Sequence, residues 1–303
     1  NDILIGPPQR FHGSHREITQ RLETVSSDLA KSWSAASIHH AGTKKEPAPC
    51  TVFLGIDGAG KSTLAELVAL RLSHGRQVAM IGDELKMFEN GSARQLQPLM
   101  TETIRRKVGN YAKHAGSLKH YKIPKLAELL LRDRLLAEVR RWYSPDLIFM
   151  DGSPLLNLVA WARLYSPDEL DQSTMNKAIA LLTHHGEQFD HSDPIFKQFP
   201  ELTTIQRLHF DRFSMPEVAV LIDIDPKIAC HRISSRGEER QIHETEEKLS
   251  RLRQAYLKVC EVVSGNWPTP VTIVDGDLSR EAAASVVLDF LRDKVGIGEK
   301  PDD

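Results

Sequence analysis

The chain has 303 residues, of which 41% are hydrophobic and 26% charged, a composition typical of a soluble globular protein. Its formal net charge is −2, so no general basic field indicates a nucleic-acid or membrane partner. Three scattered cysteines and the absence of any apolar run near the ~20 residues of a membrane span lead us to expect a cytoplasmic protein.

Residues 1–50 differ in pattern from the rest of the chain. Ile18, Leu22, Val25 and Leu29 recur at helical spacing, and the following stretch contains a glycine and two prolines, as linkers do. We therefore predict an N-terminal accessory helix and a linker. A dedicated partner-binding arm is the alternative interpretation.

From residue 51 onward, short apolar runs alternate with helical patterns. The predicted strands are 51–56, 77–81, 146–150, 217–224 and 271–275, and the predicted helices include 61–72, 125–142, 244–263 and 279–294. Continuous apolar strands joined by helices predict an α/β domain over 51–303, with a doubly wound, five-stranded parallel sheet and helices on both faces. The long connection 164–215 is predicted to be an insert that forms a lid or a binding wall.

The segment "GIDGAGKST" fits the phosphate-binding pattern G-x-x-x-x-G-K-[ST] between a predicted strand and a predicted helix. In such a P-loop, backbone N–H groups surround phosphate oxygens, the lysine neutralises charge, and the serine hydroxyl ligates Mg²⁺. The predicted nucleotide-binding residues are Gly55, Gly58, Ala59, Gly60, Lys61, Ser62 and Thr63. The alternative is a glycine-rich turn that matches the pattern by chance.

Asp151 follows four apolar residues at the end of the strand 146–150. A carboxylate at that point can hold Mg²⁺ beside a P-loop, so Ser62 and Asp151 are the predicted metal ligands. The alternative role for Asp151 is to cap the turn formed by the glycine, serine and proline that follow it.

Arg232, Arg236 and Arg240 recur at intervals of four, which would place them on one face of a helix. Arginines on a segment above a P-loop can stabilise the charge of a transferring phosphoryl group. We therefore predict a lid at about 232–247. The nearby glutamates allow the alternative of an exposed helix with salt bridges.

The motifs "FLGIDGAGKST", "ELLLRDR", "LIFMDGS", "DIDPKIACHRISSRGEER" and "LRQAYLKV" together resemble those of thymidylate kinase. The resemblance spans roughly 51–294 apart from the insert. It implies the P-loop NTPase fold of the nucleoside monophosphate kinases, with ATP and Mg²⁺ as cofactors. It also implies that Asp57 orients the acceptor, that Arg134 grips the acceptor phosphate, and that the lid arginines are catalytic.

The sequence departs from this family at the acceptor pocket. Leu130 stands where thymidylate kinases usually have a stacking phenylalanine, and Gly152 stands where they usually have an arginine. Asp83 and Glu84 lie where the neighbouring deoxynucleoside kinases place the carboxylate base for a hydroxyl group. These departures leave the identity of the acceptor open.

Basic residues with interleaved tyrosines also cluster in 105–122. They are interpreted as a solvated helix face near the acceptor site, with a patch for a nucleic-acid end as the less favoured alternative.

The leading hypothesis is an ATP-dependent kinase whose catalytic residues are Lys61, Asp57, Arg134, Arg232, Arg236 and Arg240. Its partner is expected to be a small-molecule phosphate acceptor, a nucleoside monophosphate or close analogue. The alternatives are a kinase that acts on a hydroxyl group and a non-catalytic nucleotide-binding regulator. The oligomeric state, a homodimer included, stays open.

Overall fold

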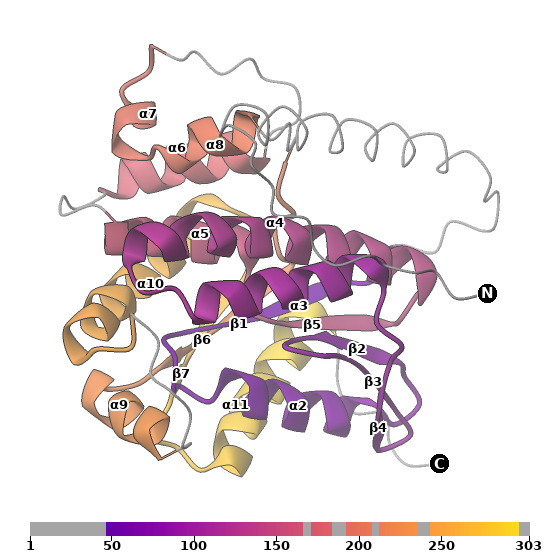
Figure 1. The fold of residues 1–303 in the computed structure, drawn as a ribbon. Helices are drawn as coiled ribbons and strands as arrows, with labels where there is room; N and C mark the ends of the chain where they lie inside the picture. The colour runs from indigo at the N-terminus through magenta and orange to yellow at the C-terminus, as the bar shows by residue number, and fades with distance from the viewer. Residues whose placement is uncertain (1–46, 166–170, 184–191, 208–211, 236–242, 297–303) are drawn as a thin grey trace, which may run out of the picture.

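The computed structural model describes residues 47–165, 171–183, 192–207, 212–235 and 243–296. These residues form a seven-stranded sheet in the order β4-β3-β2-β5-β1-β6-β7, with helices on both faces (Figure 1). The strands are β1 (Cys50–Leu54), β2 (Val78–Ile81), β3 (Leu85–Glu89), β4 (Ser92–Gln95), β5 (Leu147–Asp151), β6 (Val218–Asp223) and β7 (Val271–Asp275).

The five predicted strands are all present, and they are all parallel, in the order β2-β5-β1-β6-β7. The predicted strand count was nevertheless wrong, because β3 and β4 extend the sheet as an antiparallel hairpin beside β2. Asn90 and Gly91 join the two strands, with φ of 49° and 71°. Positive φ at both loop residues is typical of a type I′ turn, for which Asn-Gly is a preferred sequence. That dipeptide was a usable signal for the hairpin.

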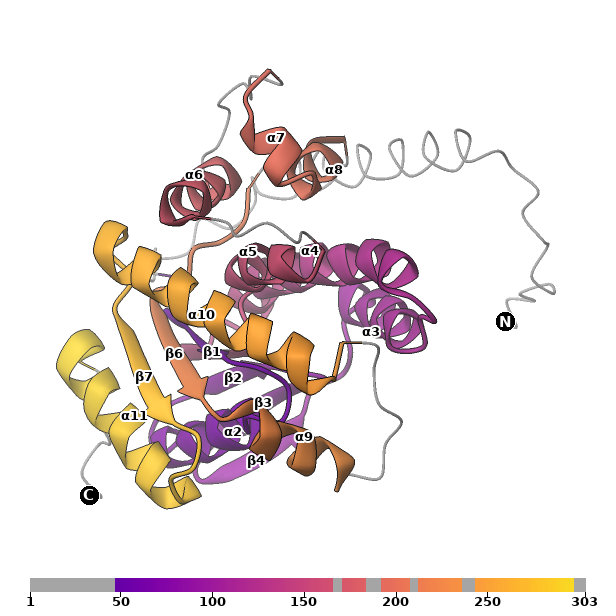
Figure 2. The ribbon, with the colours of Figure 1, turned by 90° about the vertical axis from the view of Figure 1, so that its left-hand side faces the viewer.

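Ten helices surround the sheet in the part of the chain that is described. They are α2 (Lys61–Leu72), α3 (Met100–Lys113), α4 (Leu118–Trp142), α5 (Pro154–Tyr165), α6 (Gln172–Thr183), α7 (Ile195–Gln198), α8 (Glu201–Arg207), α9 (Pro226–Ser234), α10 (Glu246–Asn266) and α11 (Arg280–Val295). Helices α2 and α11 cover one face of the sheet, and α4, α5 and α10 cover the other (Figures 1 and 2). Among these described helices, none is both long enough and apolar enough to cross a bilayer.

The predicted helix 61–72 is confirmed, whereas α4 begins seven residues before the predicted start at Lys125. The hydroxyl of Ser117 caps its first turn by accepting a hydrogen bond from the His120 amide at 3.3 Å. Helix α4 runs without a break through Pro124, and it packs against α3.

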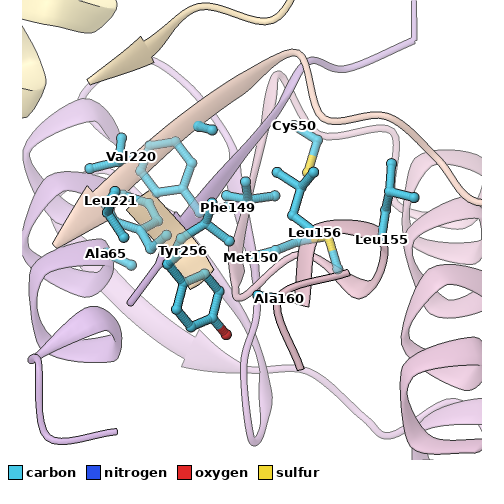
Figure 3. Close-up of a cluster of buried hydrophobic side chains, with 14 of the residues drawn as sticks. Cys50, Ala65, Phe149, Met150, Leu155, Leu156, Ala160, Val220, Leu221 and Tyr256 are labelled. Carbon is cyan, nitrogen blue, oxygen red and sulfur yellow. The ribbon is translucent and has the colours of Figure 1, made fainter. Parts of the chain in front are cut away.

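The core lies on both faces of the parallel strands. Figure 3 shows Phe149 and Met150 of β5, Val220 and Leu221 of β6, and side chains of α5 and α10 gathered in one buried cluster. Burial of a large apolar side chain stabilises the fold by about 1.5–3 kcal/mol. The rings of Phe53 and Phe149, on adjacent strands, pack edge to face with their centroids 5.4 Å apart. This rigid base fixes the strand ends on which the candidate site is built.

The arm and the insert are described only in part. Residues 1–46, which include the predicted accessory helix, lie outside the described residues. The helices described within the insert 164–215 are α6, α7 and α8. They lie on the side of α5 and α10 that faces away from the sheet (Figure 2). Trp267, which follows α10, donates to the Asn176 amide oxygen on α6 at 2.9 Å and joins the two helices.

Candidate active site

A cavity of about 880 Å³ opens at the carboxyl ends of β1, β2 and β5. The P-loop and the first turn of α2 form one wall, and residues of α3, α4, α5 and α10 form the others. Both its size and its position at the ends of parallel strands are those of a ligand site in an α/β protein. None of the insert's described residues lines it, so the role of the insert as a lid or a binding wall stays a prediction.

The P-loop takes its curved shape from glycines with left-handed backbone conformations. Gly60, at the N-cap of α2, has φ of 93°, and a side chain there would meet nothing within 4 Å. Gly58 has φ of 83°, and a Cβ would lie 2.6 Å from the Ala229 carbonyl oxygen on α9. The loop is thus packed directly on the helix that begins the predicted lid, and its amides and the N-terminus of α2 frame a phosphate site.

Two charged residues of the loop lie side by side at the cavity. The Lys61 Nζ donates to the Ile56 carbonyl oxygen at 3.0 Å and lies 3.7 Å from an Asp57 carboxylate oxygen. Burial disfavours ionisation of Asp57, but a hydrogen bond from His243 and the charges of Lys61, His243 and Lys125 outweigh it and hold the Asp57 pKa well below its usual range. Asp57 is therefore a carboxylate at neutral pH.

Ser62 and Asp151 are brought together as the sequence predicted. The Ser62 Oγ donates to the Asp151 Oδ2 at 2.5 Å, from the first turn of α2 to the last residue of β5. Hydroxyl and carboxylate oxygens are the ligands that Mg²⁺ prefers, so this pair fits the predicted metal. No group of three or more His, Cys, Asp or Glu side chains suited to a metal occurs among the described residues, so phosphate oxygens and water would complete the coordination.

On the opposite wall, three cations surround one buried carboxylate. Arg105, Lys125 and Arg132 lie 3.1, 3.1 and 2.9 Å from the carboxylate oxygens of Glu128, and we call these four residues the Glu128 cluster. Burial opposes ionisation of Glu128, but the charges of Arg132, Lys125 and Arg105 hold its pKa well below the usual range. With all four residues charged, the cluster carries a net +2 inside the cavity.

Comparison with known proteins identifies the fold. A solved structure of deoxyadenosine kinase from M. mycoides, with the products dCMP and dCDP bound, superposes with a TM-score of 0.50 at 16% identity, over 80% of this chain and 99% of that one. The chain has the fold of a P-loop nucleoside kinase.

Two further structures of that enzyme also align over 80% of this chain and 99% of their own. The form with bound dATP has 15% identity and a TM-score of 0.47, and the form with bound dCTP has 16% and 0.46. No family profile and no curated protein sequence matches the chain. Because the structure that superposes with a TM-score of 0.50 is a deoxyadenosine kinase, the narrower resemblance to thymidylate kinase stays a prediction.

Within this nucleoside-kinase fold, Arg132 and not Arg134 faces the cavity. Arg132 donates one guanidinium hydrogen bond to the Asp151 carbonyl oxygen, next to Gly152, and lines the cavity. Arg134 lies exposed, two positions further along α4, where successive side chains point to different sides of a helix. The cation that the resemblance expects at position 152 is thus supplied from α4. The sequence "RDR" contained both candidates, and only packing decided between them.

Asp83 and Glu84 line the same cavity in the loop between β2 and β3. The Arg105 guanidinium donates to the carbonyl oxygens of Gly82 and Asp83 at 2.8 and 3.0 Å, which fixes this loop against α3. The Asp83 side chain itself is 84% exposed, 3.9 Å from Lys113. Of the basic segment 105–122, Arg105 belongs to the Glu128 cluster and Arg106, Lys107 and Lys113 line the cavity, whereas Lys122 pairs with Glu201 on α8.

The predicted lid is described in part. Arg232 on α9 donates to the Gly276 carbonyl oxygen at 3.1 Å and does not line the cavity, whereas Arg236 and Arg240 lie outside the described residues. Leu130 is buried in the core and also lies outside the cavity lining.

Sequence reasoning missed an aromatic wall around His243. Tyr121, Trp161, His243 and Tyr256 come from four separate segments and all line the cavity. The Trp161 indole donates to the Tyr256 hydroxyl at 2.9 Å, which donates to the Asn157 side-chain oxygen at 3.0 Å. No local motif marks such a set, since its members meet only in the folded chain.

Proposed function

We propose that this protein transfers the γ-phosphoryl group of ATP to a small phosphorylated acceptor, a nucleoside monophosphate or close analogue. The observation that carries the proposal is the net positive charge of the Glu128 cluster in the same cavity as the P-loop. Asp83 and Asp151 offset part of this excess charge at Arg132. Among the described residues, however, the ion pairs of the three cations all go to Glu128, so the excess is costly without a further anionic partner. An acceptor phosphate supplies that partner opposite the triphosphate site.

The remaining residues have roles that follow from their positions. Mg²⁺, when bound, would supply positive charge to the phosphates of ATP. Ser62 and Asp151 would hold the magnesium ion, and the Lys61 ammonium group would neutralise part of the negative charge of the γ-phosphate. Asp57 would orient the acceptor. The roles on the ATP side that the sequence predicts for Arg232, Arg236 and Arg240 stay predictions, because no described position supports them. Positioning and electrostatics supply most of such catalysis.

The phosphate-gripping role expected of Arg134 passes to Arg132 in this proposal. Three contacts aim the Arg132 guanidinium: its Nε and Nη2 contact Glu128, and its Nη1 donates to the Asp151 carbonyl oxygen. A planar guanidinium held in this way can still offer its remaining N–H groups to a phosphate. Arg132 is the member of the Glu128 cluster that also contacts the strand end carrying Asp151, so it links the cluster to the predicted magnesium pair.

A second candidate function is phosphorylation of a hydroxyl group on a nucleoside. The placement of Asp83 and Glu84 at the cavity favours it, because a carboxylate there could accept the hydroxyl proton. The likeness to a deoxyadenosine kinase is compatible with either acceptor. Against this second function, Asp83 is mostly exposed and Glu84 lies 3.9 Å from Arg106, whereas the buried Glu128 cluster has more cations than carboxylates.

The test is steady-state kinetics of the full chain with Mg·ATP and paired acceptors: dTMP, dAMP and dCMP, each against its matching nucleoside. We expect kcat/KM for at least one monophosphate to exceed that of its nucleoside by at least ~10-fold, because only the monophosphate engages the cluster. Turnover of nucleosides alone would transfer the assignment to the second candidate. ADP formation independent of every acceptor would favour a nucleotide-binding regulator.

Arg132→Met tests the cluster itself, with Arg134→Met as the matched control from the same helix. We expect Arg132→Met to raise KM for the monophosphate by about 10- to 100-fold, the effect of one charge-assisted hydrogen bond. Glu128 keeps Arg105 and Lys125 as partners, so the fold should survive. Equal effects of the two substitutions would contradict the assignment.

A further inference from the structure

His243 is a buried polar residue that contacts the P-loop. Its side chain is 2% exposed, and its Nε2 lies 2.7 Å from the Asp57 Oδ2. Because Asp57 is a carboxylate, and hence only an acceptor, Nε2 must carry the proton and donate. The other oxygen of Asp57, Oδ1, lies 3.7 Å from the Lys61 Nζ, and the Asp57 side chain, which is one third exposed, lines the cavity.

The His243 ring, in the turn before α10, packs against aromatic rings from helices α4 and α5. Its centroid lies 5.1 Å from the ring of Tyr121 on α4 and 6.0 Å from that of Trp161 on α5, and these two rings lie 6.1 Å from each other. The ammonium of Lys125 lies 4.6 Å above the Trp161 ring. Packing on two sides leaves the imidazole little freedom to rotate, so its hydrogen bond to Asp57 is pre-organised.

The same aromatic wall connects Asp57 with the magnesium side of the cavity. Trp161 is hydrogen bonded to Tyr256, and Tyr256 to Asn157. The Asn157 side-chain nitrogen fills the space where a Cβ on Gly152 would lie, at 2.6 Å from that position. A continuous set of packed and hydrogen-bonded side chains thus runs from the P-loop acid to the residue that follows Asp151.

We infer that His243 is a positioning residue of the kinase reaction, which holds Asp57 so that its free carboxylate oxygen accepts a hydroxyl or N–H group of the acceptor. With one oxygen occupied by a fixed donor, Asp57 cannot turn away or pair fully with Lys61. Lys61 therefore stays available to the phosphates. This inference rests on the proposed function, because it assigns His243 to the acceptor half of that site.

Two substitutions separate the hydrogen bond of His243 from its packing. His243→Phe keeps a ring against Tyr121 and Trp161 but removes the donor, whereas His243→Gln keeps an N–H donor within reach of Asp57. We expect His243→Phe to raise KM for the acceptor or to lower its kcat/KM by about 10- to 100-fold, with KM for ATP within about twofold of wild type. His243→Gln should recover most of the loss. His231→Phe, at an exposed position on α9, is the control.

A double-mutant cycle with Asp57→Asn tests whether His243 acts through Asp57. We expect His243→Phe to cause little further loss in the Asp57→Asn background, since the carboxylate that it positions is already gone. Additive losses, or equal losses for the Phe and Gln variants, would overturn the inference.

A second readout does not depend on turnover. Carbon NMR titration of the Asp57 carboxyl should show a higher pKa in His243→Phe than in wild type, because the hydrogen bond that stabilises the carboxylate is lost. An unchanged titration in a folded variant would overturn the inference even if the protein phosphorylates the expected acceptor. A changed titration without any acceptor-dependent turnover would refute the proposed function alone.

Discussion

At the residue scale, the decisive side chain for phosphoryl transfer is that of Lys61. Among the described residues, its ammonium group contacts two groups of the P-loop, the Ile56 carbonyl oxygen and the Asp57 carboxylate. We predict that Lys61→Ala folds normally and loses at least ~10²-fold in kcat, because the missing charge matters most as the γ-phosphoryl group departs. Single-turnover kinetics with Mg·ATP measure this, and Lys177→Ala on α6 is the control.

A folded Lys61→Ala protein with near-normal turnover would refute the role of the P-loop in catalysis. Circular dichroism and the urea midpoint establish whether the variant is folded.

At the scale of elements, the packing of the P-loop on α9 makes its glycines unequal. We predict that Gly60→Ala costs roughly 1–2 kcal/mol of stability, the strain of a left-handed conformation with open space around it. Gly58→Ala has the same strain and also a 2.6 Å approach to the Ala229 carbonyl oxygen, so it should cost at least ~1 kcal/mol more. Urea unfolding of both variants measures the difference. Equal costs would show that α9 moves freely away from the loop.

A second prediction at this scale concerns the junction between α4 and the chain that returns from the insert to β6. The Asp133 Oδ1 accepts a hydrogen bond from the Ser214 amide at 2.8 Å. Burial raises the pKa of Asp133 to about 6 from its ordinary value of 3.8, against the lowering effects of Ser214, Arg134 and Arg140. The folded state therefore binds this proton more tightly than the unfolded state does.

The direction of the pH effect on folding stability follows from this difference in proton binding. The stability contributed by protonated Asp133 is fully present below about pH 4 and is lost as the pH rises through about 6. Asp133→Asn keeps an oxygen acceptor for Ser214 without the charge. We predict that this variant gains roughly 3 kcal/mol relative to wild type between pH 4 and pH 7. Urea unfolding at both pH values tests it, and a constant difference between the two proteins would contradict the prediction.

At the scale of the whole molecule, ligand binding at the strand ends should stabilise the entire domain, because one core underlies the sheet and the site. Mg·ATP at 100 times its Kd stabilises the folded state by about 2.7 kcal/mol, which raises Tm by roughly 5 °C or more in a domain of this size. We predict that EDTA and Asp151→Asn each remove most of this shift, since Ser62 and Asp151, which lie in contact, are the proposed metal ligands.

Differential scanning calorimetry measures the shift. If Asp151→Asn kept the full magnesium-dependent shift, Asp151 would have the alternative role of capping the turn after β5.

The sequence by itself determined the parallel strands, the phosphate loop and the pairing of Ser62 with Asp151. These depend on local patterns: continuous apolar runs, a glycine spacing, and a carboxylate at a strand end. The Asn90-Gly91 turn was also a local signal, and the antiparallel hairpin it specifies was predictable in the same way.

Only the tertiary structure decided which arginine of "RDR" faces the cavity, that Arg105 and Arg132 share Glu128, and that His243 meets Asp57. A helical period shows which positions share a face but not what that face contacts. His243 and Asp57 are 186 residues apart in the chain. Their contact arises because two neighbouring strand ends, with their loops and helices, are packed against one core, and no spacing in the sequence encodes that distance.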